Sequence, residues 1–402
     1  MLRRIRLIRI LKVLLIFTSI IFVLSCKKKS EVSIPKFPTS FVHTDFTMDD
    51  LFSDIQFIPL SSDVPFTNPV ATVLHDSLLY IPTYDGKILV FNMTGQLLHS
   101  FSKRGRGPEE YGNIKNFNII GENIFINSTV SKRIKIYDLM LNFKRDIIYP
   151  EGFTYGDLSY LDSTLFLFSG SSFKQPKYDW IAMDKKGRIT SSRNYFASKI
   201  PPMSESEASC VNITLDSCIY LYREESDTIF KIKSNMYAPY FLIDHDFEDG
   251  TKRLSQIELG NYPTPKGRKR IVRIISTGDN WIIMYTTDCN PVISETVIFN
   301  PEQNVSHLIS KITFDKGHHQ FNNGIPFDWI GTGYLFPNFF IKNDKDNYIV
   351  SIQNPSGILE FTESDRFLSS TPKYPKIKSE LVDLSKNLTL DDNPILILLK
   401  LK

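Results

Sequence analysis

Short apolar runs separated by turn residues fill most of this 402-residue chain. The clearest example begins with the run Val70 to Leu74 and continues through Leu78 to Ile81, Lys87 to Asn92 and Gln96 to Phe101. Asp-Ser, Asp-Gly and Thr-Gly turns separate these runs. Runs of this length joined by such turns are typical of antiparallel β-hairpins. The pattern therefore predicts a four-stranded antiparallel sheet, the unit of a β-propeller blade.

The same unit recurs along the chain, with a turn between its first two strands near residues 76, 122, 162, 216, 279 and 345. The first intervals between these turns match the ~40–50 residues of a four-stranded propeller blade. The later intervals are longer and require insertions. We place these insertions at Asp244 to Lys269 and His318 to Gly333, which are polar and interrupted by Gly.

Two strand patterns near the chain ends have no hairpin partner, namely Ile55 to Leu60 and Pro394 to Leu401. The sixth unit shows only two clear strands, Leu335 to Ile341 and Tyr348 to Ile352. Because an unclosed ring of sheets leaves exposed edges, we expect both terminal strands to complete this unit. The sequence thus predicts an all-β, six-bladed propeller closed by N- and C-terminal strands in its last blade. A β-sandwich with a helical appendix, from the partly helical pattern at Pro355 to Asp392, is the alternative.

The first 25 residues predict a lipoprotein signal peptide. Five basic residues precede an apolar run, Val13 to Leu24, that is short for a membrane span. The run ends in Leu-Ser-Cys, which resembles a bacterial lipobox and predicts acylation of Cys26. An uncleaved anchor helix is the alternative. We therefore divide the chain into a signal peptide (1–25), a lipid-anchored tether (26–50) and the propeller (51–402), with the lipid bilayer as a partner through Cys26.

The charge of the chain argues against a nucleic-acid partner. The formal net charge is +3, but five of the basic residues lie in the predicted signal peptide, so the remainder carries −2. Nucleic-acid binding generally requires a strong basic patch. Three cysteines remain after residue 26, Cys210, Cys218 and Cys289. Because their number is odd, at least one has no partner within the chain, and we expect buried free thiols.

The segment Ser102 to Tyr111 contains the sequence Gly-Arg-Gly-Pro-Glu-Glu-Tyr. It resembles the G-x-G-P-x-E-Y loop of the TolB-like six-bladed propeller lipoproteins of Bacteroidetes, and it is also similar to the interblade segment of NHL repeats. Glu224 to Ile232 and Asn393 to Lys402 resemble the same TolB-like family. The resemblance implies a propeller in the cell envelope, anchored to the outer membrane, and it implies no catalytic residues. The lysines that follow Cys26 favour the periplasmic face over the cell surface.

The Gly-rich loop is the candidate binding site. It lacks the Gly-Lys-Ser/Thr sequence of a P-loop. Its charged and aromatic side chains are predicted to line one mouth of the ring and to meet an anionic ligand or partner. They are Lys103, Arg104, Arg106, Glu109 and Tyr111. The alternative is a stiff connector whose charges are solvated and whose tyrosine packs on the next blade.

The sequence indicates no catalytic residues, metal site or cofactor. Asp244 to Gly250 departs from the calcium-loop spacing, and His318 and His319 are adjacent, so their rings would point to opposite faces of a strand. Trp180, Trp281 and Trp329 are candidates for stacking on sugars, but the first two lie in predicted strands and are expected in the core. The leading hypothesis is a non-catalytic module that binds an envelope protein, peptide or glycan. The rival is a propeller hydrolase, lyase or calcium-dependent lactonase, whose acids, Asn or His would converge on the central channel from several blades.

Overall fold

The computed structural model describes residues 34–37, 42–43, 46–128, 132–153, 157–169, 177–195, 210–215, 217–223, 228–233, 236–243, 269–287, 292–314, 324–342 and 346–402. The chain divides into two units, Met1–Pro35 and Lys36–Lys402, and the β-strands described below belong to the second. The lipobox, Cys26, Asp244 to Gly250 and the His318–His319 pair lie outside the described residues.

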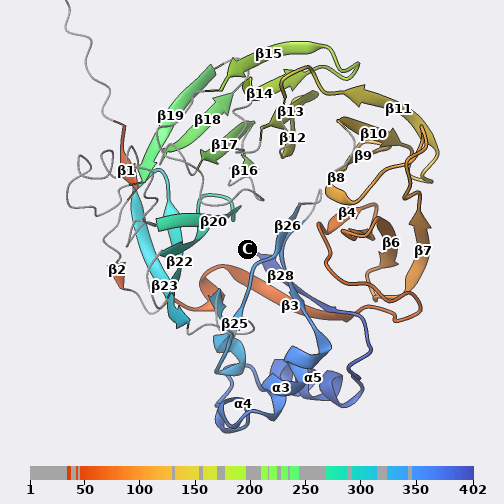
Figure 1. The fold of residues 1–402 in the computed structure, drawn as a ribbon. Coiled ribbons are helices and arrows are strands. Elements are labelled where there is room, and N and C mark those ends of the chain that lie inside the picture. The colour runs from red at the N-terminus through yellow and green to blue at the C-terminus, as the bar shows by residue number, and fades with distance from the viewer. Residues whose placement is uncertain are drawn as a thin grey trace, which may run out of the picture. The chain divides into compact units, whose positions relative to one another are not determined.

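The second unit is a six-bladed β-propeller, as predicted (Figure 1). The first three blades are antiparallel sheets of consecutive strands. Blade 1 contains β4 (Val73–His75), β5 (Leu78–Pro82), β6 (Lys87–Asn92) and β7 (Leu97–Ser102); blade 2 contains β8 (Ile114–Ile120), β9 (Asn123–Ser128), β10 (Arg133–Tyr137) and β11 (Phe143–Ile148); blade 3 contains β12 (Leu158–Leu161), β13 (Thr164–Phe168), β14 (Tyr178–Met183) and β15 (Ile189–Asn194).

The next two blades repeat this order and the last blade changes it. Blade 4 contains β16 (Cys210–Leu215), β17 (Cys218–Arg223), β18 (Thr228–Lys233) and β19 (Met236–Ile243); blade 5 contains β20 (Lys269–Ser276), β21 (Trp281–Thr287), β22 (Val292–Asn300) and β23 (Val305–Phe314); blade 6 contains β26 (Phe339–Lys342), β27 (Asn347–Gln353), β28 (Ile395–Leu401) and β3 (Phe52–Pro59). The first strands of successive blades lie innermost (Figure 1). Contacts between β20 and β26 and between β26 and β4 close this inner circle.

A strand from near the N-terminus and the C-terminal strand meet in blade 6. The C-terminal strand β28 lies between β27 and the N-terminal strand β3 and is antiparallel to both. Leu396 and Leu399 of β28 have no exposed surface. The predicted closure is therefore confirmed, and it places the most apolar strand of the chain where both of its edges are paired.

The inner strand of blade 6 is shorter than predicted. The pattern from Leu335 to Ile341 is not one strand, because Leu335 belongs to β25 (Tyr334–Leu335), which pairs with β24 (Ile325–Pro326), and β26 starts at Phe339. Pro337 lies between the two strands. Because proline has no N–H to donate to a sheet, it ends the pairing there.

A glycine joins blade 6 to blade 1. Gly95, in the turn between β6 and β7, has a φ of +83° and accepts a hydrogen bond from the Ser61 N–H at 2.8 Å. A Cβ atom at this position would overlap the backbone carbonyl of Pro59 in β3. Only glycine combines this left-handed conformation with so close an approach of two backbones.

The compact unit that contains the propeller spans Lys36–Lys402, and two short strands lie before residue 51, the predicted start of the propeller. β1 (Lys36–Phe37) pairs in parallel with the outer strand of blade 4, and β2 (Val42–His43) pairs in parallel with the outer strand of blade 5. Part of the segment predicted as a tether thus covers two sheet edges. Covering an edge in this way protects its unpaired N–H and C=O groups.

Helices fill the interval between β27 and β28. α3 (Pro355–Glu363), α4 (Asp365–Ser369) and α5 (Pro375–Lys386) pack with the 3₁₀-helices η1 (Met48–Asp50) and η3 (Asp328–Ile330) in one apolar cluster beside blade 6. Leu381 of α5 is buried in this cluster, with Leu384 and Leu388 against it, as their spacing of three and four residues predicted. Within the described residues, none of the helices has the length and apolar character to cross a membrane.

The apolar core is divided among the junctions between blades. Separate clusters of buried side chains lie between each pair of neighbouring blades, including one between blades 6 and 1. Trp180 and Trp281 belong to the core, as predicted, and Trp329 is buried as well. Cys218 is a buried free thiol. Cys210 pairs across the hairpin with Arg223 rather than with Cys218. Cys289 and the side chain of Cys210 lie outside the described part of the chain.

Candidate functional site

The Gly-rich loop carries the chain from β7, the outer strand of blade 1, to β8, the inner strand of blade 2. Its two ends are joined by backbone hydrogen bonds, from Gly105 N to Tyr111 O at 2.9 Å and from Tyr111 N to Lys103 O at 3.1 Å. A further bond runs from Glu110 N to Gly107 O at 3.1 Å. The loop is therefore a compact, internally hydrogen-bonded turn.

Tyr111 anchors this loop in the core and does not line a surface. Its side chain has no exposed area, and its hydroxyl donates to Gly86 O at 3.2 Å and accepts from Lys103 N at 3.2 Å. Its ring packs edge-on against Tyr137 of blade 2, with 5.8 Å between ring centroids. Burial raises the pKa of the Tyr111 hydroxyl to about 12. The predicted ligand contact is thus corrected: this side chain stays protonated and fixes the loop.

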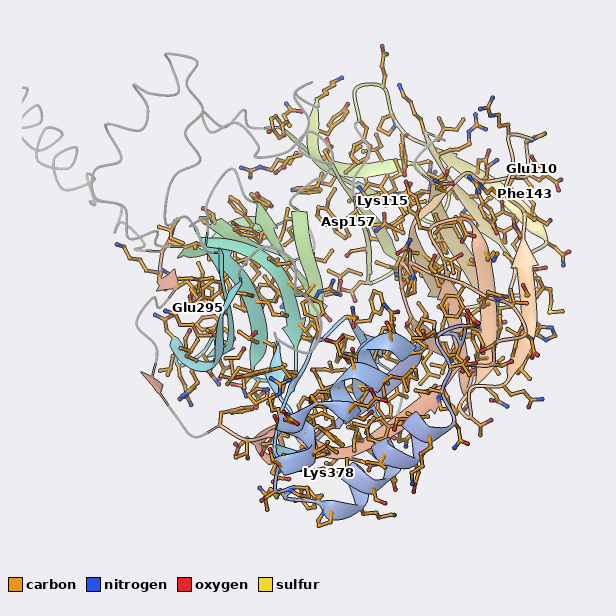
Figure 2. All side chains as sticks on the ribbon, turned by 60° about the horizontal axis from the view of Figure 1, so that its bottom comes forward. Glu110, Lys115, Phe143, Asp157, Glu295 and Lys378 are labelled. Carbon is orange, nitrogen blue, oxygen red and sulfur yellow. The ribbon has the colours of Figure 1, made fainter. Side chains whose placement is uncertain are left out.

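An internal carboxylate occupies the concave side of the loop. Glu110 accepts a hydrogen bond from Gly107 N at 2.7 Å. A Cβ atom at Gly105 would overlap this carboxylate, which explains the glycine. Figure 2 shows Glu110 on the same side of the ring as Phe143 of β11. Because backbone N–H groups in a tight loop attract negative charge, the side chain of Glu110 shows the kind of group that this loop accepts.

A buried lysine of blade 2, Lys135, contacts the Gly-rich loop. The side chain of Lys135, on β10, is only 3% exposed, and its ammonium group donates to the backbone carbonyl of Pro108. It also lies 3.0 Å from Oδ1 of Asp146, whose other oxygen is 2.7 Å from Nη1 of Arg133. Tyr137 OH donates to the Glu109 carbonyl at 2.7 Å. These contacts neutralise Lys135 and tie the middle of the loop to β10.

A pocket of about 400 Å³ opens between the loop and β10. Two of its cations, Arg106 and Lys132, are exposed and have no ion pair with any described residue. The remaining charges of the pocket are engaged, since Glu110 bonds the loop and Asp146 bonds Lys135 and Arg133. Two uncompensated cations beside a preformed loop suit a carboxylate, phosphate or sulfate group.

The structure thus separates the five residues predicted for this site. Arg106 lines the pocket and Tyr111 is buried. Glu109 is exposed, and its backbone carbonyl accepts the hydrogen bond from Tyr137 OH. The Lys103 ammonium group lies 5.8 Å from the centroid of the Tyr137 ring, and Arg104 packs over Gly86. Sequence reasoning did not include the lining residues Lys132, Arg133 and Lys135, at the start of β10. Their signal was the basic run Lys132-Arg133-Ile134-Lys135.

A second polar group links the inner strands of blades 2 and 3. Tyr149 OH donates to Oδ1 of Asn127, the Asn127 amide donates to Oδ1 of Asn116 at 3.3 Å, and the Asn116 amide donates to Oδ1 of Asp157 at 2.6 Å. Burial raises the pKa of Asp157, and the positive charge of Lys115 opposes this effect (Figure 2). These donors and acceptors satisfy one another, as expected of a structural network.

In the part of the chain that the structure describes, no group of three or more His, Cys, Asp or Glu side chains is arranged to hold a metal ion. The hydrogen-bonded series of side chains that ends at Asp157 joins two blades. The rival enzyme hypothesis expected acids, Asn or His from several blades to converge on the central channel. The side chains of this series hydrogen-bond to one another.

The sequence matches, over residues 38–400, the profile of the domain of unknown function DUF4934. The chain belongs to this family. No curated protein matches it. Among solved structures, a protein predicted to be exported from Bacteroides fragilis superposes with a TM-score of 0.62 at 15% identity, covering 90% of this chain and 98% of the other. A DUF4221 family member from Bacteroides vulgatus gives 0.52 at 9% identity, covering 88% and 97%. At these identities the similarity concerns the fold alone.

Proposed function

We propose that this protein is a non-catalytic binding module of the cell envelope, anchored to the outer membrane through acylated Cys26. Its pocket between the Gly-rich loop and β10 binds an anionic group carried by an envelope protein, peptide or glycan. The observation that carries the proposal is the pair of exposed cations, Arg106 and Lys132, in a pocket whose other charged side chains have partners.

The envelope location draws on two further observations. The basic n-region, short apolar run and Cys26 of the N-terminus form a lipoprotein signal pattern. A solved propeller of the same architecture comes from a protein predicted to be exported. The unmodified protein should incorporate an alkyne-tagged fatty acid, and a Cys26→Ser variant should not. Equal incorporation into both proteins, or incorporation into neither, would contradict the lipid anchor.

The pocket is tested with the full-length chain in nanodiscs at low salt. The probes are a hexaglutamate peptide and a uronic-acid hexasaccharide, whose affinities are measured by microscale thermophoresis. A hydrogen bond to a charged group contributes about 1.5–3 kcal/mol, so the Arg106→Ser/Lys132→Ser double variant should lose at least about tenfold in affinity. The matched control is Lys376→Ser on α5, where the side chain is 88% exposed.

The two probes distinguish an acidic peptide from an acidic glycan as the source of the anion. Binding of either probe that the double variant loses and the control keeps would support the proposal. Equal affinity in all three proteins, or no binding of either probe to the unmodified protein, would contradict it.

A further inference from the structure

An arginine lies at the inner junction of blades 5 and 6, away from the pocket between blades 1 and 2. Arg273 is in β20, the inner strand of blade 5, and pairs across the sheet with Met284. Its guanidinium carbon is 5.6 Å from the centroid of the Phe336 ring and 5.9 Å from that of Phe339. Phe339 begins β26, the inner strand of blade 6, so this side chain spans from one blade to the next.

The guanidinium group has no acceptor among the described residues. Its Nε atom is buried without a hydrogen-bond partner, and no carboxylate of the described chain forms an ion pair with it. Burial alone lowers the pKa of Arg273, to about 10, so the group remains charged at neutral pH. The side chain as a whole is only partly buried, which leaves an approach for a ligand.

This arrangement is unusual because buried charges in proteins are nearly always paired. Contacts with two aromatic rings stabilise a cation, but a ring offers no lone pair to the in-plane N–H groups. The five donors of an arginine lie in one plane and match the two oxygens of a carboxylate. The hydrogen-bond acceptor that would suit Arg273 is therefore planar and singly charged.

We propose that Arg273 anchors a second ligand site, for a carboxylate attached to an apolar or aromatic group. The carboxylate pairs with the guanidinium, and Phe336 and Phe339 contact the apolar part. A singly charged carboxylate matches the single positive charge and the planar donors of Arg273. This site is independent of the proposed anion pocket, since it uses different blades.

The probe is benzoate, with benzamide as a neutral molecule of the same shape. Binding to the full-length protein in nanodiscs is followed by isothermal calorimetry and by the ¹⁵N resonance of the Arg273 Nε–H. We expect saturable benzoate binding that moves this resonance, and no comparable binding of benzamide. Arg273→Met, which keeps an apolar stem between the rings, should weaken benzoate binding at least tenfold. Arg273→Lys, which keeps the charge without the planar donors, should weaken it less.

Two further results decide between a ligand site and a purely structural cation. If Arg273 serves a ligand rather than the fold, its charge does not stabilise the free protein. In the absence of benzoate, the melting temperature of Arg273→Met should then equal or exceed that of the unmodified protein. A lower melting temperature with no benzoate binding to the unmodified protein would overturn the inference, as would equal benzoate affinity in both. The Arg106→Ser/Lys132→Ser variant should bind benzoate normally, so failure at one site is distinguishable from failure at the other.

Discussion

Lys135 is the residue on which the shape of the loop pocket depends. Its ammonium group has two partners, the carbonyl of Pro108 and the carboxylate of Asp146 at 3.0 Å. At 3% exposure for Lys135 and 17% for Asp146, solvent screening of this pair is small. Replacing it with methionine keeps most of the apolar stem but removes both interactions. The Lys135→Met variant therefore isolates the contribution of one buried charge.

The expected loss follows from these two contacts. Breaking a buried ion pair by removing one partner generally costs about 3–5 kcal/mol. Asp146 retains its 2.7 Å contact with Arg133, so the lower end applies, and we expect a loss of about 3 kcal/mol in the free energy of unfolding. The amides of Gly105 and Tyr111, whose bonds close the loop, should also exchange with solvent faster because Pro108 is no longer held.

Urea unfolding, followed by tryptophan fluorescence, measures the first effect, and hydrogen exchange measures the second. The matched control is Lys132→Met, an exposed position in the same pocket, which should change stability by no more than about 0.5 kcal/mol. A loss below about 1 kcal/mol for Lys135→Met would refute the reasoning. So would equal losses in the two variants, because the buried pair would then contribute no more than a surface charge.

Three more substitutions test other parts of the structure by urea unfolding. Gly95→Ala should lower the free energy of unfolding by more than about 2 kcal/mol. Gly278 has a similar φ of +89° but open space around it, so Gly278→Ala should lose only the ~1 kcal/mol of backbone strain. Equal losses would contradict the close approach of blades 6 and 1. Leu399→Ala in β28 should cost about 2–5 kcal/mol in the free energy of unfolding. Leu390 is 72% exposed, so Leu390→Ala should cost under about 0.5 kcal/mol. A similarly small loss for Leu399→Ala would argue against the closure of the ring by β28. Because the pKa of Asp157 is raised on folding, the folded state keeps a proton that the unfolded state loses. The free energy of unfolding should therefore fall as the pH rises above the ordinary Asp range. This pH dependence should disappear in Asp157→Asn, and its persistence would contradict the buried acid.

The blade count was predictable because each blade carries its own local signals. The Asp76-Ser77 and Asp162-Ser163 pairs both adopt positive φ in the turns between the first two strands of their blades. Asp and Ser tolerate this conformation better than apolar residues, so the turns are marked in the sequence itself. The closing strand was marked by its continuous apolar run, because a strand paired on both edges and covered on both faces has no polar side.

Other parts of the fold left no such mark. β1 and β2 are two residues each, and they join sheet edges whose neighbours lie about 200 residues or more along the chain. Pairings this short have no hydrophobic period to detect. Likewise, the pocket depends on Lys135 reaching Pro108, a contact separated by 27 residues and by the change from one blade to the next. The loop motif was visible in the sequence, but its partner on β10 was a matter of tertiary structure.

The distribution of charge at the blade junctions explains why the two proposed sites lie where they do. Each junction is filled by an apolar cluster, so a polar side chain placed there must find a partner across the junction. Lys135 does so with Pro108 and Asp157 does so with Asn116. Arg273 lies at a junction of the same kind, yet it has no acceptor among the described residues. In our proposal, a ligand carboxylate supplies the acceptor that this junction lacks among the described residues.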